Sequence, residues 1–220
     1  MEKYAIVIAG PSGVGKTTVA DRLIEDLGTL QMSRSATTRE KRGDGRDNEY
    51  IYLQKDEFLT SIDNGDILEY TEYSGNYYGT RRCELDRIWE SKKNPILVLD
   101  YNGARSLKER LDCPTFAIYV YTSLGEAKRR LIERDERSGS TEKSREIIRK
   151  RICENVSDYK KLYTMAELFD CYIENDDLEV CISDVKRAIE TMALGKEAMD
   201  LVDKLKITNS FKTAALSFEE

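Results

Sequence analysis

The sequence predicts an α/β fold with a parallel sheet core flanked by helices, and three observations lead to this prediction. Short apolar runs alternate with segments of helical periodicity along the chain, which is typical of parallel strands joined by crossover helices. The runs that begin at Tyr4 and Ile96 are apolar on both faces, as buried parallel strands are. A length of 220 residues suits one core with attached subdomains.

The expected elements follow from these patterns. Strands are predicted over residues 4–9, 30–35, 96–100, 116–121 and 171–174. Helices are predicted over residues 16–27, 56–64, 84–92, 103–111, 124–135, 144–168 and 177–205. In the first helix Val19, Leu23 and Leu27 share one face, and Gly28 ends it. Two tyrosine-rich runs, 50–53 and 67–73, interrupt the alternation and indicate a small inserted α+β subdomain.

Composition excludes several classes of chemistry. The chain has no histidine, so it cannot use imidazole for catalysis or for metal binding. Its formal charge of -6 argues against binding to nucleic acid. The five cysteines include no C-x-x-C pair, so we expect reduced thiols. No apolar run approaches the length of a membrane span, and we expect a cytoplasmic protein without a membrane partner.

One motif carries most of the chemical information. Residues 10–17 read GPSGVGKT and match G-x-x-x-x-G-K-[ST], directly after an apolar strand and at the start of an amphipathic helix. Glycines allow backbone N–H groups to surround phosphate oxygens, Lys16 reaches the outer phosphates, and Thr17 can ligate magnesium. A glycine-rich turn with a chance Lys-Thr pair would not need this position in the fold. The motif therefore predicts binding of a nucleoside triphosphate.

Two further basic segments fit a phosphoryl acceptor and a lid. Arg39 and Arg42 follow the second predicted strand and suit a phosphate, with Tyr50 and Tyr78 as further donors. Alone, such arginines would more often be solvated, but a phosphotransferase must also hold an acceptor. Residues 128–151 contain ten Lys or Arg and five acids. This segment is either an exposed helix with i,i+4 ion pairs or a lid that brings arginines to the transferring phosphoryl group.

Four segments together resemble the guanylate kinase family. They are the loop GPSGVGKTT, the segment SRSATTREKR, the run ILEYTEYSGNYYGT at 67–80, and ENDDL at 174–178. The resemblance spans roughly residues 4–189. It implies a P-loop NTPase fold and Mg²⁺-dependent transfer of the ATP γ-phosphoryl group to GMP or dGMP, giving ADP and GDP in purine nucleotide metabolism.

The resemblance also implies roles for individual residues. ATP would be bound by Gly10, Pro11, Ser12, Gly13, Val14, Gly15, Lys16 and Thr17. GMP would be bound by Ser35, Arg39, Arg42, Tyr50, Glu69, Tyr78, Thr80 and Asp100. Catalytic roles would fall to Lys16, Arg39, Arg130, Arg134 and Arg151. Magnesium would be held by Thr17 and, through water, by Asp100.

Base selectivity has an independent chemical reason. Guanine presents two adjacent N–H donors, and an ionised carboxylate such as Glu69 accepts hydrogen bonds without donating any. Adenine offers a bare acceptor at the same place and would be repelled.

The alternatives to a guanylate kinase are a non-catalytic interaction module that binds a phosphopeptide, and a P-loop kinase acting on a sugar phosphate such as ribose 1,5-bisphosphate. Lys16 and Thr17 disfavour the first, and Glu69 with nearby tyrosines disfavours the second.

The resemblance gives a domain plan with three departures from the family pattern, namely a C-terminal extension, a residue of the third strand and the length of the lid. A guanylate kinase-like domain would occupy residues 1–190, with its core at 1–35, 82–125 and 152–190, a GMP-binding subdomain at 36–81 and a lid at 126–151. A helical extension and tail would follow at 191–220. Many family members carry two aspartates on the third strand, whereas this chain has Val98 and keeps only Asp100. The lid is several residues longer than is usual. Whether the chain forms a homo-oligomer is left open.

Overall fold

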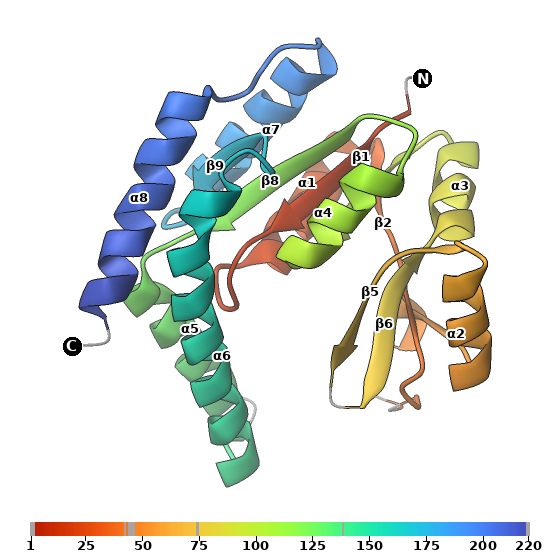
Figure 1. Ribbon diagram of the computed structural model, residues 1–220, viewed down its shortest axis with the longest axis horizontal. Helices are drawn as coiled ribbons and strands as arrows, with labels where there is room; N and C mark the ends of the chain where they lie inside the picture. Colours follow the sequence, from red (N-terminus) through yellow and green to blue (C-terminus); the bar gives the residue numbers. More distant parts are fainter. Residues whose placement is uncertain (1–2, 42, 44–46, 74, 138, 219–220) are drawn as a thin grey trace. The chain divides into compact units, whose positions relative to one another are not determined.

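The computed structural model describes residues 3–41, 43, 47–73, 75–137 and 139–218 (Figure 1). The chain forms two compact units. One comprises Met1–Val7 and Leu23–Thr115, and the other comprises Ile8–Arg22 and Phe116–Glu220. Among the described residues, no helix is long and apolar enough to span a bilayer.

A parallel sheet forms the core, as predicted. Over the described residues it contains β1 (Ala5–Ala9), β2 (Leu30–Met32), β7 (Asn94–Val98), β8 (Thr115–Tyr121) and β9 (Cys171–Glu174), in the order β2-β7-β1-β8-β9. β2 runs parallel to β7, and β8 runs parallel to β9. Every residue of β1 is buried, and all five are apolar. This is the pattern expected of a strand that is covered on both faces.

The first unit also contains a smaller sheet, ordered β4-β3-β6-β5. Its elements are β3 (Ser35–Thr37), η1 (Asp47–Glu49), β4 (Tyr50–Tyr52), α2 (Lys55–Asp63), β5 (Ile67–Tyr73) and β6 (Asn76–Arg81), and α3 (Arg82–Glu90) and α4 (Tyr101–Arg110) lie in the same unit. The core of this sheet contains Ala36, Leu53, Phe58 and Ile67. β5 and β6 form an antiparallel hairpin, and α4 packs on β5. The two tyrosine-rich runs thus supply strands of the inserted α+β sheet.

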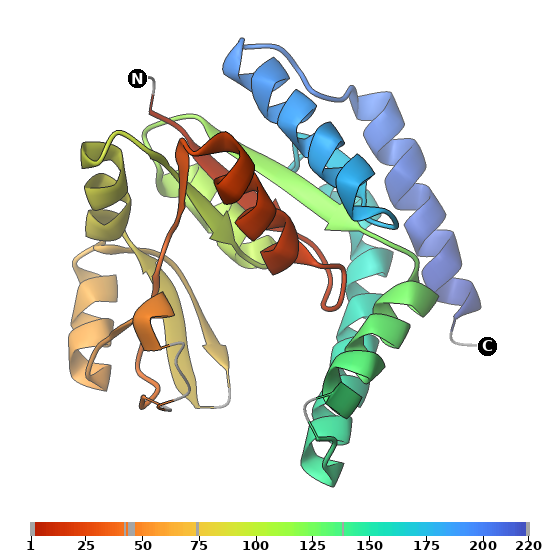
Figure 2. The same cartoon turned by 180° about the vertical axis from the view of Figure 1, so that it is seen from behind.

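Helices dominate the second unit. They are α5 (Leu124–Arg137), α6 (Glu142–Lys161), η2 (Leu162–Met165), α7 (Leu178–Ala193) and α8 (Leu201–Ser217), together with the start of α1 (Lys16–Leu27). Figures 1 and 2 show α5 and α6 side by side, with α8 along the C-terminal part of α6. Phe211 of α8 stacks on Tyr159 of α6, with ring centroids 4.9 Å apart. The C-terminal helix therefore supports the base of α6.

Four predicted elements differ from the structure. The expected helix 144–168 ends at Lys161, and the short 3-10 helix η2 follows it. The expected strand 30–35 is two strands, because the chain leaves the main sheet after β2 and enters the smaller sheet at β3. The expected strand 96–100 ends at Val98, and Asp100 instead caps α4 by accepting a hydrogen bond from the Gly103 N–H. The expected helix 177–205 is interrupted between α7 and α8, where Gly195 has a φ of 70°, a conformation that favours glycine.

Candidate active site

The phosphate-binding loop lies between β1 and α1, in red in Figure 2. Gly10 and Gly13 have φ angles of 144° and 88°. A Cβ at Gly10 would lie 2.1 Å from the Val120 carbonyl oxygen, and one at Gly13 would lie 2.6 Å from the Ala127 carbonyl oxygen. Both contacts are too short for a carbon atom, and both backbone conformations disfavour other residues. The loop therefore requires glycine at these two positions for its packing as well as for its turn.

Two buried asparagines hold the loop in shape. The Ser12 N–H donates to Asn155 Oδ1, and Asn155 Nδ2 donates to the Ser12 carbonyl, each over 2.8 Å. Asn175 Nδ2 donates to the Val14 carbonyl over 2.7 Å, and a Cβ on Gly15 would lie 2.7 Å from the same nitrogen. The two asparagines are 3% and 4% exposed. Neither asparagine is predicted from the sequence to contact the loop, although asparagine is unfavourable inside a helix and Asn155 lies within one.

Positive charge gathers at the same loop. Lys16 opens α1, and its Nζ donates to the carbonyls of Gly10 and Pro11 over 2.8 Å each. The ammonium group is thus held against the loop, beside the N-terminus of a helix, which itself favours anions. Thr17 is exposed in the first turn of α1. The arrangement is typical of a polyphosphate site, with a hydroxyl placed where a hard cation can be bound.

The basic segment of the second unit contains both solvated ion pairs and the predicted lid arginines. Glu126 accepts hydrogen bonds from Arg129 and Arg130, each at 2.6 Å, and these bonds lower the pKa of Glu126 to about 2. Arg134 is exposed on α5, and Arg151 is half-buried on α6. The i,i+3 and i,i+4 pairs of the alternative interpretation are therefore present. Arg130 is itself one of the paired residues, and the roles of Arg130, Arg134 and Arg151 toward a phosphoryl group stay predictions.

In the first unit, three of the predicted phosphate ligands lie together. The Arg39 guanidinium carbon is 5.2 Å from the centroid of the Tyr50 ring. The Tyr50 and Tyr78 rings meet edge to face with centroids 6.3 Å apart. Tyr52, which the sequence analysis did not select, accepts a hydrogen bond of 3.4 Å from Arg39 Nη2. Arg42 lies outside the described residues. The cluster offers guanidinium and hydroxyl donors to a single anion.

A buried carboxylate lies in the same unit. Glu69 of β5 is 6% exposed, and Thr80 Oγ1 donates to its Oε1 over 2.6 Å. Gly103 of α4 faces the other oxygen, because a Cβ on it would lie 3.0 Å from Glu69 Oε2. Burial raises the pKa of Glu69 to about 7, with a further increase from the charge of Asp100 and opposition from the Thr80 bond. The group is thus poised between its two protonation states at neutral pH.

The start of β3 is fixed by a second buried carboxylate. Glu84 of α3 is 2% exposed and forms ion pairs with Arg34 at 2.9 Å and with Arg87 at 2.7 Å. Burial alone would raise the pKa of Glu84, but hydrogen bonds from Arg87 and Arg34 outweigh it and lower the pKa to about 2. Arg34 directly precedes Ser35, which lies opposite Tyr50 in the β3–β4 register. The ion pairs therefore hold the segment that carries Ser35.

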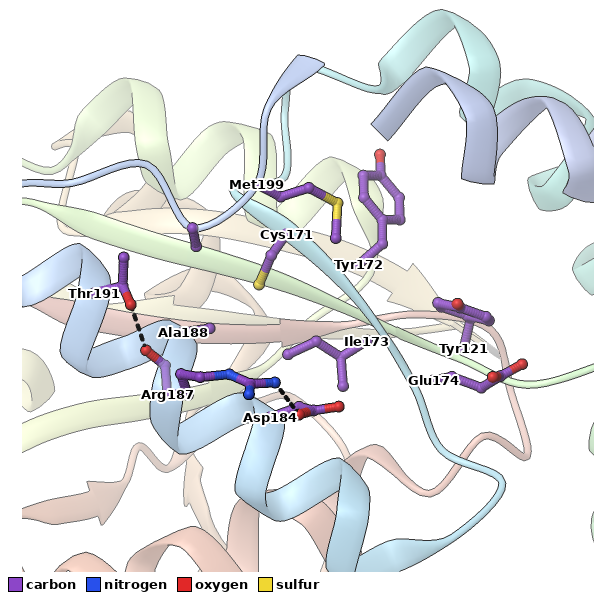
Figure 3. Close-up of a pocket in the computed structure, with 11 residues that line it drawn as sticks. Tyr121, Cys171, Tyr172, Ile173, Glu174, Asp184, Arg187, Ala188, Thr191 and Met199 are labelled. Atoms are coloured by element: carbon purple, nitrogen blue, oxygen red, sulfur yellow. Dashed lines mark hydrogen bonds and ion pairs between the residues drawn. The ribbon is translucent and has the colours of Figure 1, made fainter. Parts of the chain in front are cut away.

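A separate pocket of about 420 Å³ lies in the second unit, between β9, α7 and the segment before α8 (Figure 3). Within it, Arg187 pairs with Asp184, and Thr191 Oγ1 donates to the Arg187 carbonyl. None of its lining residues belongs to the predicted site. We assign this pocket no part in the phosphate or acceptor chemistry.

The glycine-rich loop and the cluster of Arg39, Tyr50 and Tyr78 define the class of protein. A glycine-rich loop with a lysine between a buried strand and a helix, joined in one chain to a second anion site and a buried carboxylate, is typical of a P-loop nucleotide phosphotransferase. Comparison with known proteins names the family. A family model described as guanylate kinase matches residues 2–192. The chain belongs to the guanylate kinase family, whose members are nucleoside monophosphate kinases that transfer a phosphoryl group from ATP to GMP.

Individual relatives agree with this assignment. A guanylate kinase of Porphyromonas gingivalis is 37% identical over 188 residues, covering 84% of this chain and 95% of its own. One of Oceanobacillus iheyensis is 34% identical over 192 residues, covering 87% and 88%. The crystal structure of guanylate kinase from Anaplasma phagocytophilum superposes with a TM-score of 0.59 at 26% identity, covering 86% of this chain and 85% of the other.

Proposed function

We propose that this chain transfers the γ-phosphoryl group of ATP to GMP, or to dGMP, giving ADP and GDP or dGDP for purine nucleotide metabolism, with Mg²⁺ bound alongside ATP. The observation that carries the choice of acceptor is the buried Glu69, held by Thr80. An ionised carboxylate accepts both the N1–H and the N2–H of guanine. No other common base presents two adjacent donors in that arrangement, so the acceptor is a guanine nucleotide.

The acceptor phosphate would lie at the second anion site. Arg39, Tyr50 and Tyr78 supply its donors, and Arg42 is proposed from the sequence alone. A guanidinium fork with two phenol hydroxyls can bind an anion without protonating it. One acceptor oxygen then remains free to attack the γ-phosphorus. Ser35 and Thr80 are proposed to contact the base, as the family resemblance implies.

Transfer needs positioning and charge stabilisation more than covalent chemistry. The GMP phosphate oxygen bonds to the γ-phosphorus while the bond to the bridging oxygen of ADP breaks, and that oxygen keeps the electron pair. Negative charge spreads over the equatorial oxygens of the transferring group. We assign Lys16 and the lid arginines Arg130, Arg134 and Arg151 to those oxygens. Direct transfer also requires water to be excluded once both substrates are bound.

The residues present fit a bound Mg²⁺. Thr17 offers an exposed hydroxyl oxygen in the first turn of α1, the type of ligand that this hard cation takes together with phosphate oxygens and water. When bound, the ion neutralises charge on the β- and γ-phosphates. Asp100 is proposed to act through water and on GMP. It also caps α4, so its side chain already has a structural role.

An acceptor survey tests the proposal. Release of ADP from ATP would be followed in a coupled assay with GMP, dGMP, AMP, UMP and ribose 1,5-bisphosphate. We expect rapid release with GMP, slower release with dGMP, and little with the others. Preference for the sugar phosphate would replace the guanine assignment. A chain that is inactive with all five acceptors would instead be a non-catalytic module.

A further inference from the structure

The link between α6 and the phosphate loop suggests a role for a residue that the proposed function leaves unassigned. Asn155 lies inside α6 and is 3% exposed. Its amide binds both backbone groups of Ser12, accepting from the N–H and donating to the carbonyl. Only a side chain with one acceptor and one donor at this spacing can satisfy both groups. Asn155 therefore connects a helix to the loop through two bonds of fixed direction.

Asn155 also marks the point where α6 leaves the core. Within the described helix, the buried residues are Asn155, Val156 and Tyr159. Every residue from Glu142 to Glu154 is exposed or half-buried. Apart from the packing between α5 and α6, the direction of these thirteen residues therefore depends on the buried part of the helix further along. A small change in direction at Asn155 would move the far end of α6 by several ångströms, because each residue advances the helix by about 1.5 Å.

Three residues four positions apart run along one side of the helix. Tyr159 donates a hydrogen bond of 2.6 Å to the Thr122 carbonyl after β8, and its ring is stacked on Phe211. Asn155 follows at the phosphate loop. Arg151 comes next and is half-buried. Residues at i and i+4 share a helix face, so Arg151 begins about 6 Å beyond the side chain that binds Ser12.

We propose that Asn155 is a positioning residue that sets the register of Arg151 against the phosphate loop and so couples nucleotide binding at the loop to the lid helix. The proposal rests on the proposed function for the role of Arg151, while the link between Asn155 and Ser12 is a feature of the structure. Asn155 touches the loop backbone and acts through two other groups, the Ser12 peptide and the Arg151 guanidinium.

Substitutions at one helix position test this role. Asn155→Ala removes both bonds to Ser12. We expect kcat/KM for ATP to fall by roughly tenfold or more, while the KM for GMP stays within about twofold. Asn155→Ser leaves space for water to satisfy the Ser12 peptide, so it retains folding but loses the rigid link, and the same split is expected. Glu154→Ala is the matched control, because that side chain is half exposed and pairs only loosely with Lys150.

A double-mutant cycle tests the connection to Arg151. The cycle compares the loss of kcat caused by Arg151→Ala in the wild type with the loss that it causes in Asn155→Ala. If Asn155 acts through Arg151, the loss in the Asn155→Ala background should be at least about fivefold smaller. Multiplying losses would overturn the proposal, as would an equal rise in KM for both substrates. Affinity for a fluorescent ATP analogue without GMP should fall in Asn155→Ala and not in Glu154→Ala. This binding measurement does not depend on which acceptor the enzyme uses. It therefore distinguishes an error in the proposed acceptor from an error in the proposed role of Asn155.

Discussion

The buried carboxylate Glu69 gives the account its sharpest pH dependence. Its pKa is raised to about 7 by burial and by the charge of Asp100, against the hydrogen bond from Thr80. Guanine needs the ionised form as a double acceptor. The ionised fraction falls from about nine-tenths at pH 8 to about one-tenth at pH 6. Apparent affinity for the base should therefore fall about tenfold over this range.

Glu69→Gln provides the control for this experiment. A protonated carboxyl presents one donor and one acceptor, as a glutamine amide does, so the wild type at low pH should approach the variant. At pH 8 the variant should bind GMP more weakly by roughly 1 to 3 kcal/mol. The phosphate of GMP also titrates, with a second pKa of about 6. That effect is shared by both proteins and cancels in the ratio of their dissociation constants.

Calorimetry at pH 6, 7 and 8 in two buffers of different ionisation enthalpy would measure both affinity and proton release. We expect the wild-type advantage over Glu69→Gln to shrink about tenfold from pH 8 to pH 6. Near pH 7 the wild type should release about half a proton more than the variant. A ratio that is constant between pH 6 and pH 8 would show that Glu69 does not read the base in its ionised form.

The same shift makes a prediction about folding. The folded-state pKa of Glu69 lies above its ordinary value of 4.5, so the folded protein holds the proton more tightly. The contribution of Glu69 to the free energy of unfolding therefore falls as pH rises from 4.5 through 7, by about 3 kcal/mol in total. Glutamine does not titrate. Urea unfolding would measure the free energy of unfolding of both proteins at pH 4.5 and pH 8. Between these two pH values, the stability of Glu69→Gln relative to the wild type should rise by that amount. A difference that is the same at both pH values would contradict the raised pKa.

Other predictions follow from the loop, the lid and the ion pairs. Lys16→Ala should remove most turnover and leave GMP affinity intact in calorimetry, and near wild-type turnover would refute the loop assignment. Arg134→Ala should lower kcat by up to ~10³, whereas Arg137→Ala on the same helix should change it little, since a placed guanidinium rather than bulk charge is needed; equal losses would favour bulk charge. Glu84→Gln should cost about 2–3 kcal/mol in urea unfolding at pH 7. This loss should vanish as pH falls from 4.5 toward 2, because the depressed pKa of Glu84 stabilises the fold only while the group is ionised.

The parts of the site that could be predicted from sequence depend on local spacing. The glycines of the phosphate loop and Lys16 are close together in the sequence, so their spacing alone predicts the conformation of the loop. The place of Tyr50 and Glu69 in the inserted α+β subdomain followed from the tyrosine-rich runs, and the choice of Tyr78 was supported by the family resemblance. These residues now lie on β4, β5 and β6. Their roles toward GMP stay predictions.

The missed features depend on contacts between distant residues. The expected strand 30–35 divides at a segment that Glu84 of α3 binds through Arg34, and no local pattern announces that partner. Asn155 contacts Ser12 across 143 positions. In the C-terminal extension, apolar residues such as Leu194 and Val202 are 73% and 61% exposed, while Thr208 is fully buried. Apolar content therefore indicated a helix there without indicating which face it buries.

The most direct test of the central claim follows the fate of the transferred group. ATP labelled in its γ-phosphoryl group would be incubated with the enzyme, GMP and Mg²⁺, and the products separated. We expect labelled GDP in equal amount to ADP, no label on the protein, and loss of labelled GDP in Lys16→Ala. Label recovered as free phosphate, on the protein, or on a different acceptor offered together with GMP would contradict it.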